Sequence, residues 1–308
     1  MKAIRFAVGS LLFMAIFASA SMAQLQRSFV SGLGNDMNPC TRTAPCRTFN
    51  QAISQTNARG EVYVLDTAGY GPFTINKAIS IVAQGVTAGI SVFSGDGIDI
   101  NAGALDTVIL RGLTVNNQGT PDGGGIVFIA GGTLHIEGCV VNGFNTSPGL
   151  GGINFQGGAR LEVKDSILRG NLVGVDVGAT SGTAQAVIDQ VRLEGNETGV
   201  VAGTGSKVTV RNSLASGNGN GFLAVSSSAA NAELNIENCV ASNNISGIVA
   251  RSDSTGVATV RVSNSTVTDN NIGLENGGSP AVLLSRGNNT VEGNTNNTAG
   301  TVGAYSAK

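Results

Sequence analysis

The chain has 308 residues, a formal net charge of −2, only 12% charged residues, and no cluster of lysines and arginines. This argues against nucleic-acid binding, which needs several cations to displace phosphate counterions, and no basic amphipathic segment points to a membrane surface. The 45 glycines, the lack of tryptophan and the 41% hydrophobic residues favour tightly turned β-structure with an ample core over helix.

The N-terminus has the pattern of a secretory signal peptide. Lys2 and Arg5 precede an apolar run over residues 6–17, and a site of small residues follows it. The run is too short to span a bilayer, and no later apolar stretch has membrane-spanning length. We therefore expect a signal peptide over residues 1–23 and an exported mature domain over residues 24–308, periplasmic or extracellular, without a membrane span.

The first two of the four cysteines lie close together in the chain, before any repeat begins. Cys40 and Cys46 bracket the sequence Thr-Arg-Thr-Ala-Pro. Disulfides form and persist in oxidising compartments outside the cytoplasm. We expect Cys40 and Cys46 to be bonded to each other.

Most of the remaining chain, over about residues 108–294, repeats with an uneven period. Each repeat opens with an apolar residue, and successive openings are 27, 25, 22, 26, 26 and 22 residues apart. Such periods indicate a solenoid, and the alternation of apolar and polar residues within each repeat indicates strands. The opening residues are Ile136, Val163, Ile188, Val210, Ile236, Val262 and Leu284.

A second apolar column follows the first at a constant distance. From Val163 to Val175, and in the four repeats after it, the distance is always 12 residues, whereas the return to the next repeat takes 10 to 14. One side of each coil is therefore predicted to have a fixed length. The second column contains Ile126, Ile153, Val175, Val200, Phe222, Ile248 and Leu274.

Two further columns follow from this register. Cys139 and Cys239 share one position four coils apart, roughly 19 Å at the spacing of stacked strands, too far for a disulfide. We expect both to be buried free thiols. One asparagine per coil occupies another position, where its amide can bond to its equivalents in adjacent coils. This predicted asparagine ladder contains Asn171, Asn196, Asn218, Asn244 and Asn270.

Together, these repeats resemble right-handed parallel β-helix proteins of the pectate-lyase-like superfamily, an all-β solenoid fold. The segment before the repeats resembles the N-terminal entry of secreted members. The resemblance implies a cap over residues 24–60, with an amphipathic helix over 48–57 that covers the open end of the core, and first strands over 61–65 and 78–83. It does not specify function, because the superfamily includes lyases, hydrolases, epimerases, adhesins and proteins without known activity.

Outward residues of the first strand alternate in sign from coil to coil, as expected for a face that neutralises its own charge. They are Arg111, Glu137, Lys164, Asp189, Arg211 and Glu237. The resemblance implies that lyases and hydrolases use this surface with clustered aspartates or acidic calcium ligands, which alternating signs would neutralise.

No catalytic motif of the superfamily was identified, and four residues remain as weak catalytic candidates. They are Arg111, His135, Glu162 and Lys164. His135 lies beside Glu162 of the next coil, so the two could form an acid/base pair or be solvated strand positions. With a single histidine most zinc sites are excluded. The carboxylates Asp96, Asp99, Asp106 and Asp122 show no ligand spacing, so we expect no metal and no cofactor.

Two adjacent coils break the constant spacing. The 12-residue distance becomes 16 between Leu110 and Ile126 and 17 between Ile136 and Ile153. The extra residues predict neighbouring loops over 116–125 and 142–152, which could form a binding lip or be tolerated insertions. The candidate binding residues are Asn116, Asn117, Asp122, Asn142, Asn145 and Ser147, with Phe144 as the sole aromatic platform.

Three functions remain open. The first is a non-catalytic scaffold or binding protein, expected to be a monomer, whose partner is a polysaccharide or cell-surface glycan. The second is a polysaccharide lyase or glycoside hydrolase with an unrecognised site. The third is an adhesin-like passenger, although the C-terminal sequence TVGAYSAK shows neither barrel strands nor an anchor.

Overall fold

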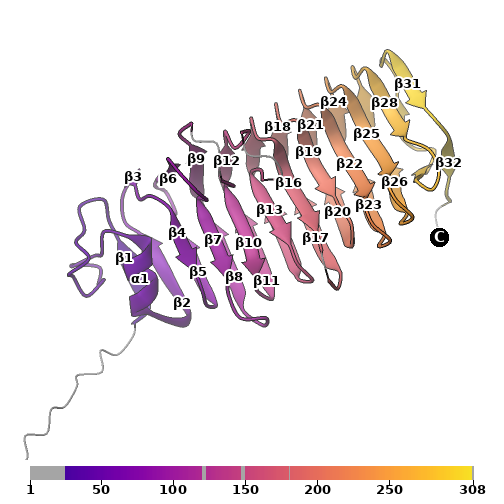
Figure 1. Cartoon of the computed structure of the whole chain (residues 1–308). Helices are drawn as coiled ribbons and strands as arrows, with labels where there is room; N and C mark the ends of the chain where they lie inside the picture. The colour runs from indigo at the N-terminus through magenta and orange to yellow at the C-terminus, as the bar shows by residue number, and fades with distance from the viewer. Residues whose placement is uncertain (1–24, 120–122, 147–149, 180, 307–308) are drawn as a thin grey trace, which may run out of the picture.

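The computed structural model describes residues 25–119, 123–146, 150–179 and 181–306. The chain winds into an elongated parallel β-solenoid whose coils follow one another from the N-terminal to the C-terminal end (Figure 1). The predicted signal peptide lies outside the described residues. Within the described part of the chain, no helix is both long enough and apolar enough to cross a bilayer.

Each complete coil contributes one strand to each of three parallel sheets, which we call sheets A, B and C. Sheet A contains β1 (Leu25–Val30), β2 (Thr56–Val64), β5 (Ile79–Val82), β8 (Thr107–Arg111), β11 (Thr133–Glu137), β14 (Arg160–Lys164), β17 (Ala184–Asp189), β20 (Ser206–Arg211), β23 (Ala232–Glu237), β26 (Ala258–Ser263), β29 (Val282–Ser285) and β32 (Val302–Ala304).

The strands of sheet B follow those of sheet A after a two-residue turn in most coils. Sheet B contains β3 (Ala68–Gly69), β6 (Ala88–Val92), β9 (Leu113–Asn117), β12 (Val140–Asn142), β15 (Ile167–Arg169), β18 (Arg192–Glu194), β21 (Leu214–Ser216), β24 (Val240–Ser242), β27 (Thr266–Thr268) and β30 (Thr290–Val291).

The strands of sheet C complete each coil before the chain returns to sheet A. Sheet C contains β4 (Phe73–Ile75), β7 (Ile98–Asn101), β10 (Ile126–Ala130), β13 (Ile153–Gln156), β16 (Val173–Gly178), β19 (Thr198–Ala202), β22 (Asn220–Ser226), β25 (Ser246–Ser252), β28 (Ile272–Asn276) and β31 (Asn296–Ala299).

Two left-handed residues per coil explain the constant 12-residue leg, which runs from sheet A through sheet B to sheet C. In the coil that starts at Val163, Asp165 and Gly170 have φ of 50° and 62° and turn the chain at the two corners. Glycine, asparagine and aspartate adopt this backbone conformation more readily than other residues. The same two offsets recur in the next four coils, at Gln190 and Gly195, Asn212 and Gly217, Asn238 and Asn243, and Asn264 and Asp269.

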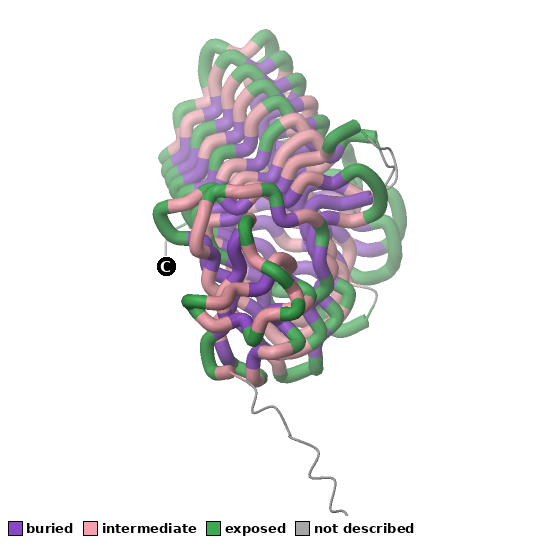
Figure 2. The backbone as a smooth tube through the Cα atoms, turned by 90° about the vertical axis from the view of Figure 1, so that its left-hand side faces the viewer, coloured by how far each residue is buried: buried purple, intermediate pink, exposed green. Residues whose placement is uncertain are grey.

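The core is a continuous apolar interior enclosed by the three sheets, and buried stretches recur at the same places in successive coils (Figure 2). Strand pairing confirms the second predicted apolar column throughout, and the first from Ile136 to Val262. Parallel stacking aligns equivalent residues, so each coil covers the apolar face that its neighbour cannot bury alone.

The prediction for Leu284 was wrong by one residue. Val262 pairs with Ser285, and Leu283, which is 1% exposed, takes the core position opposite Val260. The preceding connection from sheet C is of variable length, so the register there is not fixed by the constant leg. A shift of one residue moves a strand side chain to the opposite face, which places Leu284 outside the core.

The asparagine ladder is confirmed and extends to Asn294. In each step, a side-chain Oδ1 accepts hydrogen bonds from the backbone N–H and the side-chain Nδ2 of the preceding ladder residue. For example, Asn218 Oδ1 accepts from the backbone N–H of Asn196 at 2.9 Å and from its Nδ2 at 3.0 Å. Asn218 Nδ2 also donates to Leu193 O at 3.0 Å. The ladder therefore satisfies buried polar groups at one corner of the coils from Asn171 to Asn294.

The remaining cysteines behave as predicted. Cys139 and Cys239 are buried free thiols, and each Sγ lies near the carbonyl oxygen of a residue in the preceding coil, Leu110 at 3.7 Å and Val210 at 3.6 Å. Burial raises the pKa of both thiols to about 11, which keeps them protonated and unreactive.

An N-terminal cap closes the first coil, as the resemblance implied. Helix α1 (Phe49–Gln55) is shorter than expected, because Thr48 is its N-cap and Thr56 already starts β2. Its buried Phe49 packs against the rings of Phe73 at 4.5 Å and Tyr70 at 5.2 Å. The first two expected strands correspond to β2 and β5 with shifted ends.

The predicted disulfide between Cys40 and Cys46 is present in the loop that precedes α1. The carboxylate of Asp36 fixes the same loop, since it accepts hydrogen bonds from the backbone N–H of Arg47 at 2.8 Å and of Thr48 at 2.9 Å. Asp66 accepts from the Ser31 hydroxyl at 2.6 Å.

Truncating one ladder asparagine should destabilise the whole solenoid. We expect Asn218→Ala to lower the free energy of unfolding by about 2–4 kcal/mol, because it removes several bonds and leaves buried groups unsatisfied. The matched control is Asn220→Ala, whose half-buried amide makes one long contact of 3.4 Å to Thr198. Denaturant unfolding measures both, and equal losses would contradict a special role for the ladder.

The cap should loosen in acid. Burial alone would raise the pKa of Asp66, but hydrogen bonds from Ser31, Tyr70 and the Gly32 N–H hold it below its usual value of 3.8. Its stabilising effect is therefore present above pH 4 and lost as the pH falls through the depressed pKa. We expect Asp66→Asn to lower the thermal midpoint at pH 7 and to reduce its fall between pH 7 and pH 3. The control Asp269→Asn, at an exposed position, should change neither the thermal midpoint at pH 7 nor its fall between pH 7 and pH 3.

Candidate functional site

Four of the six outward charges in the predicted column of sheet A form cross-strand pairs. The register aligns the predicted column, and Glu137 Oε2 lies 2.8 Å from Arg111 Nη2, while Asp189 Oδ2 lies 3.0 Å from Arg211 Nη2. Exposed pairs of this kind contribute at most about 1 kcal/mol each. Their main effect is to leave these carboxylates and guanidinium groups already partnered.

The four weak catalytic candidates lie on three neighbouring strands of this face, β8, β11 and β14. His135 Nδ1 lies 3.0 Å from Glu162 Oε2, so the predicted neighbours do form a pair. Arg111 is bonded to its carboxylate partner on β11, and Lys164 Nζ lies 3.6 Å from the adjacent Asp165. The face thus holds the four side chains in separate pairs that do not converge on one point.

The two predicted loops begin side by side, on the ends of β9 and β12. Asn142 Nδ2 donates to Asn116 Oδ1, and Asn117 Nδ2 donates to Gly143 O at 3.0 Å. These three amides therefore tie one loop to the next. Asn145 is exposed. The candidates Asp122 and Ser147 lie outside the described residues.

Phe144 is not a surface platform. Its ring is 1% exposed, and its backbone N–H donates to Asn171 Oδ1 at 3.1 Å. It thus stands at the ladder position of its own coil, where the coils that follow carry asparagine, and its ring is part of the buried core. The expectation that this ring would stack on a sugar is corrected by its burial.

Two carboxylates under the first loop come closer together than their sequence spacing suggested. Asp96 Oδ1 accepts a hydrogen bond from Gly124 N at 2.6 Å, which places it at the end of the loop. Burial, followed by the charge of Asp96 and a hydrogen bond to it, raises the pKa of Asp99 to about 6. Asp99 Oδ1 is buried and accepts no hydrogen bond from the described residues. Asp99 therefore holds its proton at a higher pH than an ordinary aspartate does.

The outer face of sheet C also has a hollow of about 600 Å³, which we call the sheet C hollow. Gln156 Nε2 donates to Asp176 Oδ2 at 3.1 Å inside it, and burial raises the pKa of Asp176 to about 6 although this hydrogen bond opposes the rise. The residues that define it are Gln156, Asp176, Val201, Thr204, Val225 and Ser228.

Asp176 was not among the sequence-predicted candidates. The signal that could have found it is a pair of glycines at outward positions beside it, Gly178 and Gly203, where other coils carry larger residues. An outward carboxylate flanked by missing side chains indicates a depression in an otherwise level sheet.

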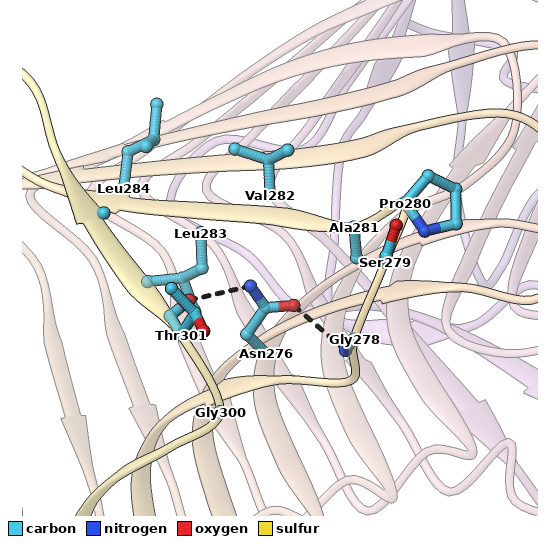
Figure 3. A pocket seen from close by; sticks show the side chains of 11 residues that line it. Asn276, Gly278, Ser279, Pro280, Ala281, Val282, Leu283, Leu284, Gly300 and Thr301 are labelled. Atoms are coloured by element: carbon cyan, nitrogen blue, oxygen red, sulfur yellow. Dashed lines mark hydrogen bonds between the residues drawn. The ribbon is translucent and has the colours of Figure 1, made fainter.

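A further hollow of about 470 Å³ lies at the C-terminal end of the solenoid (Figure 3). Asn276 crosses it, donating to Thr301 O at 2.8 Å and accepting from Gly278 N at 3.1 Å. No titratable side chain lines this hollow. The side-chain amide of Asn276 is already hydrogen-bonded within the protein. This hollow therefore offers less for binding than the sheet C hollow.

Metal ligands do not gather anywhere in the part of the chain that the structure describes. Within those residues, no three His, Cys, Asp or Glu side chains form a group that could hold a metal ion.

The chain belongs to the right-handed beta helix family, whose model matches residues 96–296. Among solved structures it is similar to the pectate lyase Pel9A, with a TM-score of 0.65 and 19% identity over 91% of this chain and 80% of that one. It is also similar to a rhamnogalacturonan lyase, with a TM-score of 0.45 and 14% identity over 86% of each chain.

A third similar structure is a pectin methylesterase from Aspergillus niger, with a TM-score of 0.44 and 11% identity over 91% of this chain and 85% of that one. No curated protein sequence matches the chain. At 19% identity, the similarity to the pectate lyase shows the fold alone.

The burial of Phe144 can be tested directly. We expect Phe144→Ala to lower the free energy of unfolding by about 3–5 kcal/mol, the usual result of removing a buried aromatic ring. The adjacent Asn145→Ala, at an exposed position, should change it by no more than about 0.5 kcal/mol. Denaturant unfolding of both variants decides the point. If Phe144→Ala left the free energy of unfolding unchanged but lost glycan binding, the ring would have to be a surface platform after all.

Proposed function

We propose that this protein is an exported, monomeric, non-catalytic β-helix that binds glycans. The observation that carries the proposal is the pairing of charges on the outer face of sheet A. Arg111 is held by Glu137, Glu162 by His135 and Asp189 by Arg211, all at 3.0 Å or less.

This pairing matters because polysaccharide cleavage makes demands that paired charges do not meet. A lyase needs a cationic or basic side chain free to remove a proton beside acidic calcium ligands, and a hydrolase needs two carboxylates facing one bond. On sheet A, Arg111 and Arg211 already neutralise the carboxylates beside them. A long face of regularly spaced polar side chains remains, which suits contact with an extended chain of sugars.

Two further observations support the glycan and the compartment. The similarity to a pectate lyase supports a polysaccharide as the partner, since such an enzyme acts on one. The disulfide between Cys40 and Cys46 supports an oxidising compartment, in agreement with the predicted signal peptide.

A second candidate function, a polysaccharide hydrolase, is favoured by Asp96 and Asp99. A carboxyl group whose pKa is raised to about 6 beside another carboxylate has the properties of a general acid paired with a general base. Asp96 accepts a hydrogen bond from Gly124 N, so the pair lies beside the end of the predicted lip.

One assay separates the two functions. The full mature chain is incubated with uronate and neutral polysaccharides, with and without calcium, and we expect binding by co-sedimentation without release of reducing or unsaturated ends. Product that disappears in Asp99→Asn but persists in the exposed control Asp253→Asn would establish the hydrolase instead. Trimming both loops to the 12-residue spacing tests the predicted lip, which contributes to binding only if the trimmed chain binds more weakly.

A further inference from the structure

The sheet C hollow exists because two side chains are missing from the sheet. Gly178 ends β16, the strand that contains Asp176, and Gly203 directly follows the neighbouring strand β19. A Cβ built on Gly178 would lie 2.7 Å from Gln156 Oε1, and one on Gly203 would lie 3.2 Å from Val177 O. The two glycines thus keep open a depression whose volume of about 600 Å³ is within the range of small-molecule sites, about 300–1,000 Å³.

The rim of the hollow is held in place before any ligand arrives. Thr204 Oγ1 accepts a hydrogen bond from Ser227 N at 2.9 Å, and Ser228 Oγ accepts one from Ala230 N at 3.2 Å. Each hydroxyl therefore keeps its own proton available for a ligand. A rim fixed in this way loses little conformational entropy on binding.

Asp176 provides the acceptor. Its Oδ2 accepts from Gln156 at 3.1 Å, and its Oδ1 accepts no hydrogen bond from the described residues. Among the residues that line the hollow, Asp176 is the only charged one, and Val201, Val225 and Ala179 supply apolar surface around it. Polar hydroxyls can therefore meet the carboxylate while C–H groups contact the wall.

We propose that the sheet C hollow binds a residue of a neutral oligosaccharide, whose hydroxyls donate to Asp176 and whose C–H face packs on Val201 and Val225. A uronate is disfavoured there because its carboxylate would lie near that of Asp176 with no lining cation to offset the repulsion. The inference rests on the proposed glycan-binding function and names the site and the sugar class.

The test uses the full mature chain and neutral gluco-, xylo- and galacto-hexasaccharides in buffer with a chelator, with titration calorimetry as the readout. We expect Asp176→Asn to weaken binding at least about tenfold, the effect of losing one charge-assisted hydrogen bond. Val225→Phe should abolish binding, because the larger side chain fills the hollow.

Matched controls separate these effects from misfolding. Asp269→Asn, at an exposed turn, and Val240→Phe, on the outer face of sheet B, should bind like the unaltered chain, and all variants should keep its circular dichroism spectrum and thermal midpoint. A folded Val225→Phe that still binds the hexasaccharides would overturn the hollow as the site.

The two levels of the proposal can fail separately. If the unaltered chain binds uronans but none of the neutral hexasaccharides, the hollow inference is overturned and the glycan-binding function stands. If it binds no polysaccharide of either kind, both are overturned. Binding of a neutral hexasaccharide that is lost in both hollow variants and kept in both controls supports both.

Discussion

The structure depends on the two left-handed corners that recur at fixed offsets in each coil. In the coil that starts at Val210, they fall at Asn212 and Gly217, and the same offsets hold in every coil from Val163 to Val262. Because strand side chains alternate between faces, a corner displaced by one residue would turn an entire column from core to solvent. The corners therefore fix the apolar columns, the asparagine ladder and the outward charges together.

The positions of core and surface residues could be predicted from the sequence where these corners set the register. The constant distance identified the apolar columns, the ladder and the separation of Cys139 from Cys239 without knowledge of any contact. It failed at Leu284, because that strand follows a connection from sheet C to sheet A, whose length varies. Periodicity is informative only in the part of a repeat that keeps its length.

The errors at the candidate site have a different origin. Phe144 was assigned to a loop because its segment breaks the 12-residue spacing, yet it precedes Asn171 by 27 residues, the same step that separates Ile136 from Val163. The sequence therefore held a signal for its ladder position. The proximity of Asp96 to Asp99 and the depth of the sheet C hollow had no such signal in the spacing, since both depend on how turns fold over the sheet.

The two outer faces differ in how they treat carboxylates, and this difference bears on function. On sheet A, Glu137 and Asp189 are paired with arginines, whereas on sheet C burial raises the pKa of both Asp99 and Asp176 to about 6. These two residues belong to one outward column, with Val127 and Asn154 between them. At three strand spacings they stand roughly 14 Å apart, a distance that a short oligosaccharide can span. A glycan lying along sheet C would therefore meet both carboxylates, so the sheet C hollow and the hydrolytic candidate place their ligand on the same face.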